Sequence, residues 1–403
     1  MTLVVQKYGG SSLANAERIR VVADRIRRKH AEGNEVVVVV SAMGDSTDDL
    51  IALAHSVNPE PDRREMDMLL STGETVSATL VAMALDAQQC PVVSLTGPQL
   101  GIQTDRSHSR ALIVDINTDR VHAELNRGRC VIVTGFQGVT DEGDVTTLGR
   151  GGSDTSAVAL ACALEAPRCE IFTDVDGVYT ADPRLVPNAR LLPEISYEEM
   201  LELAQRGARV VHARAVELGE LYSVPIEVRS SFHERPGTLI HRGGAMETRK
   251  RVRGIAHDTD VAKITVAGIP DRPGIARSIF APLAEAGINV DVIIQASSIE
   301  GLAEISFTVS RADFGSALEI TNRVGQELSG RVESASNLAK VSIVGTGLQS
   351  TPGDAALMFS TMAERGVNID MITTSDIRIT CVIDATRVPE AVQALHDAFE
   401  LES

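Results

Sequence analysis

Two glycine-rich segments, each with one cationic side chain, could hold anionic groups. Lys7-Tyr8-Gly9-Gly10-Ser11-Ser12 follows a short apolar run, and Gly149-Arg150-Gly151-Gly152-Ser153-Asp154-Thr155-Ser156 leads into a helical pattern. Glycines let backbone N–H groups approach phosphate oxygens, and a helix N-terminus adds partial positive charge. Two such segments predict a site that brings a nucleotide phosphate and an acceptor together, as a kinase requires.

Each segment also has a plainer structural interpretation. The first is not a Walker-type loop, because Lys7 precedes its glycines. Gly9-Gly10 alone is typical of a tight turn between a strand and a helix, and Asp154 could simply cap the helix that follows it. Gly73, in Ser71-Thr72-Gly73-Glu74, interrupts an otherwise helical stretch. Glu74 is therefore either placed for a purpose or lies in the first turn of a helix.

The elements that must position these residues alternate between strand and helix over residues 1–230. The five valines of Glu35–Val40 predict a strand buried on both faces, as in a parallel sheet covered by helices. The remaining expected strands are Leu3–Lys7, Pro91–Leu95, Arg129–Val133 and Cys169–Thr173, and the expected helices are Ala14–Lys29, Met66–Leu85 and Ser153–Leu164. This order predicts an α/β/α sandwich with right-handed crossovers.

The C-terminal part repeats itself. Val261–Val266 matches Leu338–Ile343, and the turn at Gly287 matches the turn at Gly366, with offsets of 340 − 263 = 77 and 366 − 287 = 79. Two copies of one unit are expected, each a ferredoxin-like βαββαβ module, at residues 261–335 and 336–403. Residues 231–260 then form a linker, whose basic residues are interpreted as solvated, and whose Met246 could serve as an internal start.

Composition excludes several classes of partner. Lys plus Arg is 38 and Asp plus Glu is 55, so the formal charge is 38 − 55 = −17, which disfavours nucleic acid and membrane surfaces. None of the five cysteines forms a CxxC pair, so neither a metal site nor a disulfide framework is expected, and a reducing cytoplasm is the simple interpretation. The first residues read as a strand rather than a signal peptide, and no apolar run approaches the roughly 20 residues of a membrane span.

Six motifs in order make the chain resemble the aspartate kinases of the amino-acid kinase family. They are Lys7–Ser12, Ser41–Leu50, Ser71–Glu74, Gly135–Gly138, Thr147–Ser156 and Thr173–Arg184. The C-terminal repeat resembles the paired ACT modules that follow the kinase domain in this family. The compact layout is similar to the members inhibited by lysine and threonine, whose regulatory half is also made from an internal start.

The resemblance implies transfer of the γ-phosphoryl of MgATP to the β-carboxylate of L-aspartate. Lys7 and Asp154 are the implied catalytic residues, with Asp154 as an organiser of the positive groups. The implied ATP-binding residues are Lys7, Gly9, Gly10, Ser11, Ser41, Thr173, Asp174, Tyr179, Arg184 and Arg209. The implied substrate-binding residues are Thr47, Glu74, Arg150, Gly151, Gly152 and Ser153. Arg209 stands where many members carry Lys, and Ala213 stands where many carry Pro. Because Arg keeps the charge of Lys but not its shape, Arg209 is expected to affect nucleotide affinity rather than the reaction.

The same resemblance implies feedback inhibition by lysine and/or threonine at the ACT modules. The effector positions are Asp271, Gly274, Ala276, Asn289, Asp291, Gln295, Asn368 and Ile369. A homo-oligomer or an αβ assembly through the ACT modules is expected, because exposed sheet edges tend to pair. Two rivals stay open: another amino-acid kinase that acts on a different carboxylate, and a catalytically inactive ACT sensor.

Overall fold

The computed structural model describes residues 2–208, 210–243, 252–297, 301–346, 348 and 353–402. The chain divides into two compact units, of which unit 1 comprises residues 1–179 and 191–247 and unit 2 comprises residues 180–190 and 248–403. Residues 180–190 therefore leave the first unit and belong to the second. Each unit has its own sheet and its own apolar core.

Unit 1 is built on an eight-stranded sheet in the order β10-β12-β11-β9-β1-β2-β6-β3. The six strands from β11 to β3 are parallel, whereas β12 runs antiparallel to β11. The strands are β1 (Leu3–Tyr8), β2 (Glu35–Val40), β3 (Val92–Leu95), β6 (Cys130–Thr134), β9 (Cys169–Thr173), β10 (Glu194–Ser196), β11 (Ile226–Ser230) and β12 (Thr238–His241). The expected α/β class is confirmed, and the expected strand at Cys169–Thr173 coincides with β9.

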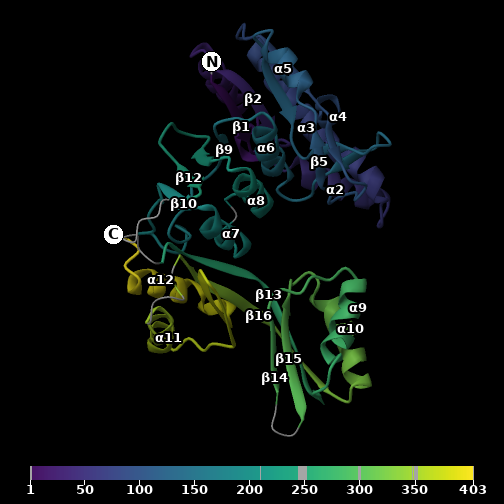
Figure 1. Ribbon diagram of the computed structural model, residues 1–403, viewed down its shortest axis with the longest axis vertical. Helices are drawn as coiled ribbons and strands as arrows, with labels where there is room; N and C mark the ends of the chain where they lie inside the picture. Colours follow the sequence, from purple (N-terminus) through teal and green to yellow (C-terminus); the bar gives the residue numbers. More distant parts are fainter. Residues whose placement is uncertain are drawn as a thin grey trace. The chain divides into compact units, whose positions relative to one another are not determined.

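Burial explains why the valine run forms a central strand. All five valines of β2 are fully buried, because the sheet carries side chains from both faces into packed layers. On one face, α1 (Ala16–Ala31) contributes Ile19, Val22 and Ile26 to a core shared with α3 (Arg63–Asp86). Further helices of unit 1 are α2 (Ser46–Val57), α4 (Gly97–Leu100), α5 (Asp119–Leu125), α6 (Gly152–Ala163), α7 (Tyr197–Gln205) and α8 (Ala213–Tyr222) (Figure 1).

A small four-stranded sheet in the order β5-β4-β7-β8 completes unit 1. Its strands are β4 (Ile102–Thr104), β5 (Ile113–Ile116), β7 (Gln137–Val139) and β8 (Val145–Thr147). Among the helices that the structure describes, α3 alone is long and apolar enough by composition to span a bilayer. Its buried residues Ala78, Val81 and Leu85 lie in the core of unit 1, as those of a core helix do.

Unit 2 has one six-stranded antiparallel sheet in the order β14-β15-β13-β16-β18-β17. Its strands are β13 (Gly254–Pro270), β14 (Ile293–Ser297), β15 (Leu302–Val309), β16 (Arg331–Val344), β17 (Met371–Ser375) and β18 (Arg378–Asp384). The helices are α9 (Ile275–Glu285), α10 (Phe314–Glu327), α11 (Asp354–Glu364) and α12 (Val388–Ala398) (Figure 1). Two copies of the repeated unit are present: the first has the predicted order β13-α9-β14-β15-α10-β16, whereas the second, β16-α11-β17-β18-α12, has no strand after α12 among the described residues.

The two modules share their central strands. β13 and β16 pair antiparallel from Gly254, opposite Val344, to Ala267, opposite Arg331, with register shifts between Asp258 and Lys263. Residues 254–258, which the sequence pattern assigned to the linker, thus extend β13 alongside the first strand of the second module. The boundaries of that linker and of the two modules stay predictions.

The repeat also appears as a reciprocal pair of salt bridges. Lys263 of the first module contacts Asp370 of the second at 2.6 Å, and Lys340 of the second contacts Asp291 of the first. The lysines are equivalent in the repeat, and so are the aspartates. These pairs flank a small apolar cluster of Val261, Val292, Leu338, Met371 and Val382, so the two modules are joined by matched contacts from each side.

Candidate active site

The carboxyl ends of β1, β2, β6 and β9 meet at one edge of the parallel sheet. β1 lies between β2 and β9, and the chain reaches β9 only after it has built the β2 side of the sheet. Ligands of open α/β sheets bind at such switch points, outside the carboxyl ends of the strands. The backbone joins these ends, because the Gly9 N–H donates to Phe172 O at 3.2 Å and the Gly135 N–H donates to Val40 O at 2.9 Å.

Lys7 and Asp154 meet at this edge. The Lys7 Nζ lies 2.7 Å from Asp154 Oδ1, and both residues are 9% exposed. The other Asp154 oxygen accepts the backbone N–H of His212 at 3.2 Å. The N-cap of α6 is Gly151, not Asp154, so Asp154 serves no capping role. Its carboxylate instead fixes the ammonium of Lys7 beside the glycine turn that follows β1.

Two glycines permit close packing around this turn. A Cβ on Gly10 would lie 2.7 Å from Ala42 O, and a Cβ on Gly73 would lie 2.9 Å from the Ala42 Cβ. α3 runs without a break through Gly73, so the expected interruption of the helix at Ser71–Glu74 is wrong. Gly73 is needed because the helix lies against the segment after β2, and Glu74 is thereby brought to that segment in mid-helix.

Glu74 is a buried carboxylate with one free acceptor. It is 3% exposed, and its Oε1 accepts the Ala42 N–H at 3.1 Å. Its buried Oε2 has no hydrogen-bond partner among the residues that the structure describes. Burial raises the pKa of Glu74 from 4.5 to about 7. Such an oxygen is suited to a ligand ammonium, which would satisfy it and favour its ionised form.

The second glycine-rich segment turns sharply before α6. Gly149 and Gly151 have φ values of +77° and +69°, in the left-handed region. A Cβ on Gly151 would lie 2.1 Å from His212 Cγ, so the imidazole abuts the turn. Ser153 is buried against Gly135, whereas Arg150 is exposed. Thr47 is half-buried in the first turn of α2, after the β2 loop.

Sequence patterns gave no sign of Asp67, which supports this turn. Its carboxylate is fully buried in α3 and accepts the Thr147 hydroxyl at 2.5 Å and the Ser109 N–H at 3.0 Å, with His108 Nδ1 at 2.9 Å. Ser109 in turn packs closely against Gly149, since a Cβ on Gly149 would lie 2.9 Å from Ser109 O. Asp67 thus ties together the loop before β5 and the strand that leads into Arg150.

The predicted nucleotide residues divide between the units. Thr173 and Asp174 end β9, where the Thr173 hydroxyl donates to the Asp174 carboxylate at 3.1 Å. The Tyr179 hydroxyl donates to Asp176 at 3.2 Å. Arg184 belongs to unit 2 and pairs with Asp182 at 2.7 Å. Arg209, like Met246, lies outside the described residues.

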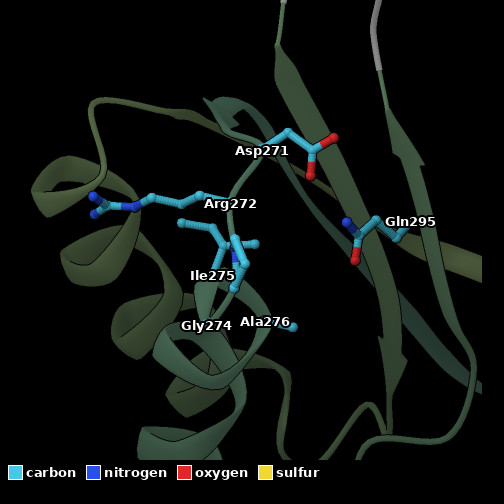
Figure 2. Close-up of a pocket in the computed structure, with 7 residues that line it drawn as sticks. Asp271, Arg272, Gly274, Ile275, Ala276 and Gln295 are labelled. Carbon is cyan, nitrogen blue, oxygen red and sulfur yellow. The ribbon is translucent and has the colours of Figure 1, made fainter.

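Unit 2 contains an open pocket of about 400 Å³ at the N-terminus of α9. It is lined by Asp271, Arg272, Pro273, Gly274, Ile275, Ala276 and Gln295. Figure 2 shows the Asp271 carboxylate and the Gln295 carboxamide on the same side of the loop, while the Arg272 side chain extends away from them. A carboxylate, a carboxamide and a helix N-terminus are groups that can bind an ammonium and a carboxylate together.

The structure brings four of the eight predicted effector residues to this pocket. Asn289 and Asn368 are exposed in the equivalent turns of the two modules. Asp291 pairs with Lys340, and Ile369 packs on the core that contains α11 and α12. Of these four residues outside the pocket, Asp291 alone is shown to contact the other module.

Comparison with known proteins places the chain among characterised families. The model of the amino acid kinase family matches residues 2–230, and ACT domain models match residues 263–328 and 341–399. Aspartokinase from Mycolicibacterium smegmatis is 50% identical over 100% of this chain and 97% of its own length. Aspartokinase from Thermus thermophilus is 49% identical over 100% of both chains.

Solved structures agree with these relatives. E. coli aspartokinase III in complex with aspartate and ADP, in the R-state, matches with a TM-score of 0.83 at 26% identity and covers 99% of both chains. The same enzyme in complex with lysine and aspartate, in the T-state, matches with a TM-score of 0.76.

Proposed function

Because this chain belongs to the aspartokinases of the amino acid kinase family, and is thus an ATP-using aspartate kinase, we propose that it transfers the γ-phosphoryl of MgATP to the β-carboxylate of L-aspartate and is inhibited by lysine and/or threonine. The product is 4-phospho-L-aspartate. The observation that carries the proposal is the buried Lys7–Asp154 pair at the switch point between the two glycine-rich turns.

The acceptor needs no general base. A carboxylate with a pKa near ~4 is ionised at neutral pH, so the difficulty is to bring two anions together. Lys7 is placed to offset the charge that develops on the transferred phosphoryl, and Asp154 holds the Lys7 ammonium in position. In the turn at Gly9, Gly10 and Ser11, the Gly9 N–H is bound to Phe172 O, so the backbone donors to the phosphates are assigned to Gly10 and Ser11. Mg²⁺, bound through the nucleotide phosphates, supplies further neutralisation of that charge.

Recognition of aspartate is assigned to two oppositely charged side chains. The free Oε2 of Glu74 accepts the α-ammonium, and the exposed Arg150 forks onto the α-carboxylate. Gly151, Gly152 and Ser153 form the turn beneath the substrate, with Thr47 at the end of the β2 loop. A carboxylate for the ammonium and a guanidinium for the α-carboxylate together favour an α-amino acid over other carboxylates or carbamates.

The nucleotide is assigned to the ends of the two strands that flank β1. Ser41 follows β2, and Thr173 and Asp174 follow β9, so all three lie at the edge that carries Lys7. Tyr179, Arg184 and Arg209 complete the proposed set. ADP and aspartate occupy the related E. coli enzyme together, which is consistent with this division.

The pocket of unit 2 is the proposed effector site. The Asp271 carboxylate would accept the effector ammonium, Gln295 would contact its α-carboxylate or side chain, and the N-terminus of α9 at Gly274 favours the carboxylate. Inhibition requires that the effector bind a less active arrangement more tightly than the active one. Lysine in the T-state structure of the E. coli relative supports this kind of control.

We also infer a cytoplasmic homo-oligomer or αβ assembly. All five cysteines are free thiols, as is usual in a reducing compartment. β14 and β17 are the outer strands of the six-stranded sheet, and unpaired strand edges favour pairing with another chain. Neither nucleic acid nor a membrane has a place in this proposal, because the chain carries a formal charge of −17.

The deciding assay is ADP release from MgATP with L-aspartate as acceptor, with and without lysine plus threonine. Aspartate-dependent release that the two amino acids suppress supports both parts of the proposal. Release without suppression would keep the kinase and reject these effectors. No aspartate-dependent release from folded protein would reject the acceptor, and release with another carboxylate, or none at all, would favour the two rival functions.

A further inference from the structure

Three side chains that can bind soft cations gather at the opposite edge of the parallel sheet. His30 lies in the last turn of α1, Cys90 lies between α3 and β3, and Cys130 is the first residue of β6. The carboxyl end of β6 is four residues further on, about 13 Å away at 3.3 Å per residue. The cluster therefore lies apart from the edge that carries Lys7 and Asp154.

The spacing of the two sulfurs matches that of two thiolates on one metal ion. Cys90 Sγ lies 3.8 Å from Cys130 Sγ. In a tetrahedral zinc site, with Zn–S bonds of about 2.3 Å, two sulfurs are about 3.8 Å apart. One ligand atom from each of His30, Cys90 and Cys130 lies within 4.8 Å of the other two. A small shift of the half-buried His30 ring would complete three arms of a tetrahedron.

The environment of His30 favours a metal-binding tautomer. Its Nδ1 lies 3.3 Å from the backbone oxygen of Asn34, a distance at which an N–H donates to a carbonyl. The proton is then on Nδ1, and the lone pair is on Nε2. Metal-binding histidines usually donate their second ring N–H to a carbonyl or carboxylate in this way, which fixes the ring and raises the basicity of the ligand.

We propose that His30, Cys90 and Cys130 bind one thiophilic d¹⁰ cation, Zn²⁺ being the best match, with water in the fourth position. Two thiolates and a neutral imidazole balance the 2+ charge and satisfy the preference of zinc for nitrogen and sulfur. The ion would tie the ends of α1 and α3 to the starts of β3 and β6. The ion would take no part in phosphoryl transfer, because the cluster lies at the opposite edge of the sheet from Lys7.

Binding exchanges two protons for the metal ion. Cys90 and Cys130 each form a metal–sulfur bond and release the thiol proton to solvent, with no change of oxidation state. Burial raises the pKa of both thiols, while the nearby Arg27 acts to lower that of Cys90. Because binding releases these protons, the affinity for the cation should increase with pH.

The test uses Co²⁺ as a spectroscopic probe on the full-length, chelator-treated protein. Thiolate–cobalt bonds give charge-transfer absorption that carboxylate-bound Co²⁺ lacks. We expect one such Co²⁺ per chain, displaced by Zn²⁺. Loss of a supporting contact already costs 10–100-fold in metal affinity, so Cys130→Ser and His30→Gln should each weaken binding by about 100-fold or more. Cys162→Ser, at a half-buried cysteine in α6, should bind Co²⁺ as the parent does.

The two variants differ in how deeply the replaced side chain is buried, so the test stays decisive if one of them folds poorly. Cys130 is fully buried, whereas His30 is half-buried at the end of a helix, so His30→Gln is the milder change. Absence of the charge-transfer band in the parent protein would refute the site. So would an equal loss in Cys162→Ser, or capture of Cys90 and Cys130 as a disulfide under mild oxidation that Zn²⁺ does not prevent.

Discussion

Replacing Glu74 by glutamine should stabilise the protein at pH 8 while it weakens the binding of aspartate. Burial raises the pKa of Glu74 from 4.5 to about 7. Each pKa unit corresponds to about 1.4 kcal/mol, so the ionised side chain costs the folded state about 3 kcal/mol. The amide introduced by Glu74→Gln would leave a buried N–H₂ in place of the free Oε2, at a cost of about 1 kcal/mol. The net gain in the free energy of unfolding is then about 2 kcal/mol.

The stability difference between Glu74→Gln and the parent protein should depend on pH. Below pH 4.5 the carboxyl is protonated in both the folded and the unfolded chain, and it contributes no pH-dependent term. As pH rises from 4.5 to about 7, the unfolded chain ionises first, so Glu74 progressively destabilises the fold. Glu74→Gln should therefore exceed the parent in stability at pH 8, and this advantage should disappear near pH 4.5. Chemical denaturation at several pH values measures this difference in the free energy of unfolding.

The same ionisation should control substrate binding. If Glu74 accepts the aspartate ammonium as a carboxylate, KM for aspartate should rise about tenfold for each pH unit below about 7, while KM for ATP stays level. Glu74→Gln should raise KM for aspartate at pH 8 and flatten this profile. A variant that is no more stable than the parent at pH 8, with an unchanged KM, would refute the reasoning.

Glu124 is the matched control. It is also fully buried, and burial acts to raise its pKa, but Arg127, Arg120 and Arg129 outweigh this effect and hold the pKa below its usual value. Its ionised form therefore stabilises the fold, the opposite of Glu74. Glu124→Gln should lower stability at neutral pH and leave KM for aspartate unchanged.

Three further substitutions test other parts of the structure. Lys7→Ala should lower kcat by about 100-fold or more, since it removes a fixed cation from the developing charge, and parent-like turnover in folded protein would contradict the site. Gln295→Ala should leave uninhibited activity near normal but shift the inhibition curve to higher effector concentration; an unchanged curve argues against the pocket. Asp67→Asn should raise KM for aspartate more than KM for ATP, because it loosens the Ser109 contact with the turn at Gly149; equal effects on both constants would point to a purely structural role.

Local patterns in the sequence predicted the α/β core well. A run of five valines is compatible with few environments other than a central parallel strand, and the structure buries all of them. The repeat likewise predicted the two modules, because its offset is nearly constant. Lys7 and Asp154 could be paired in advance only through the resemblance to a family, since 154 − 7 = 147 residues separate them.

Contacts between distant residues were not predictable from local patterns. Gly73 was expected to break a helix. It is instead required because Ala42, which follows β2, packs so closely that a side chain at position 73 would clash with it, and no helical pattern reveals this contact. Asp67 resembles any acidic residue near a helix start until the fold brings Ser109 and Thr147 to it. His30, Cys90 and Cys130 lack the short spacing of a metal motif, because parallel-sheet topology rather than sequence proximity brings them together.

Residues 180–190 connect unit 2, through the covalent chain, to the loop that we propose binds the nucleotide. The chain leaves unit 1 directly after Tyr179, buries Ala181 and Val186 in the core of unit 2, and returns at Leu191. The Thr180 hydroxyl meets His396 of α12 at 2.9 Å inside that core. The core of unit 2 therefore contains residues that belong, by sequence, to the amino acid kinase domain. A rearrangement of that core should therefore change the conformation of the loop that begins at Asp174. A separate chain that starts at Met246 would lack residues 180–190, and its core would be incomplete unless another chain supplied them.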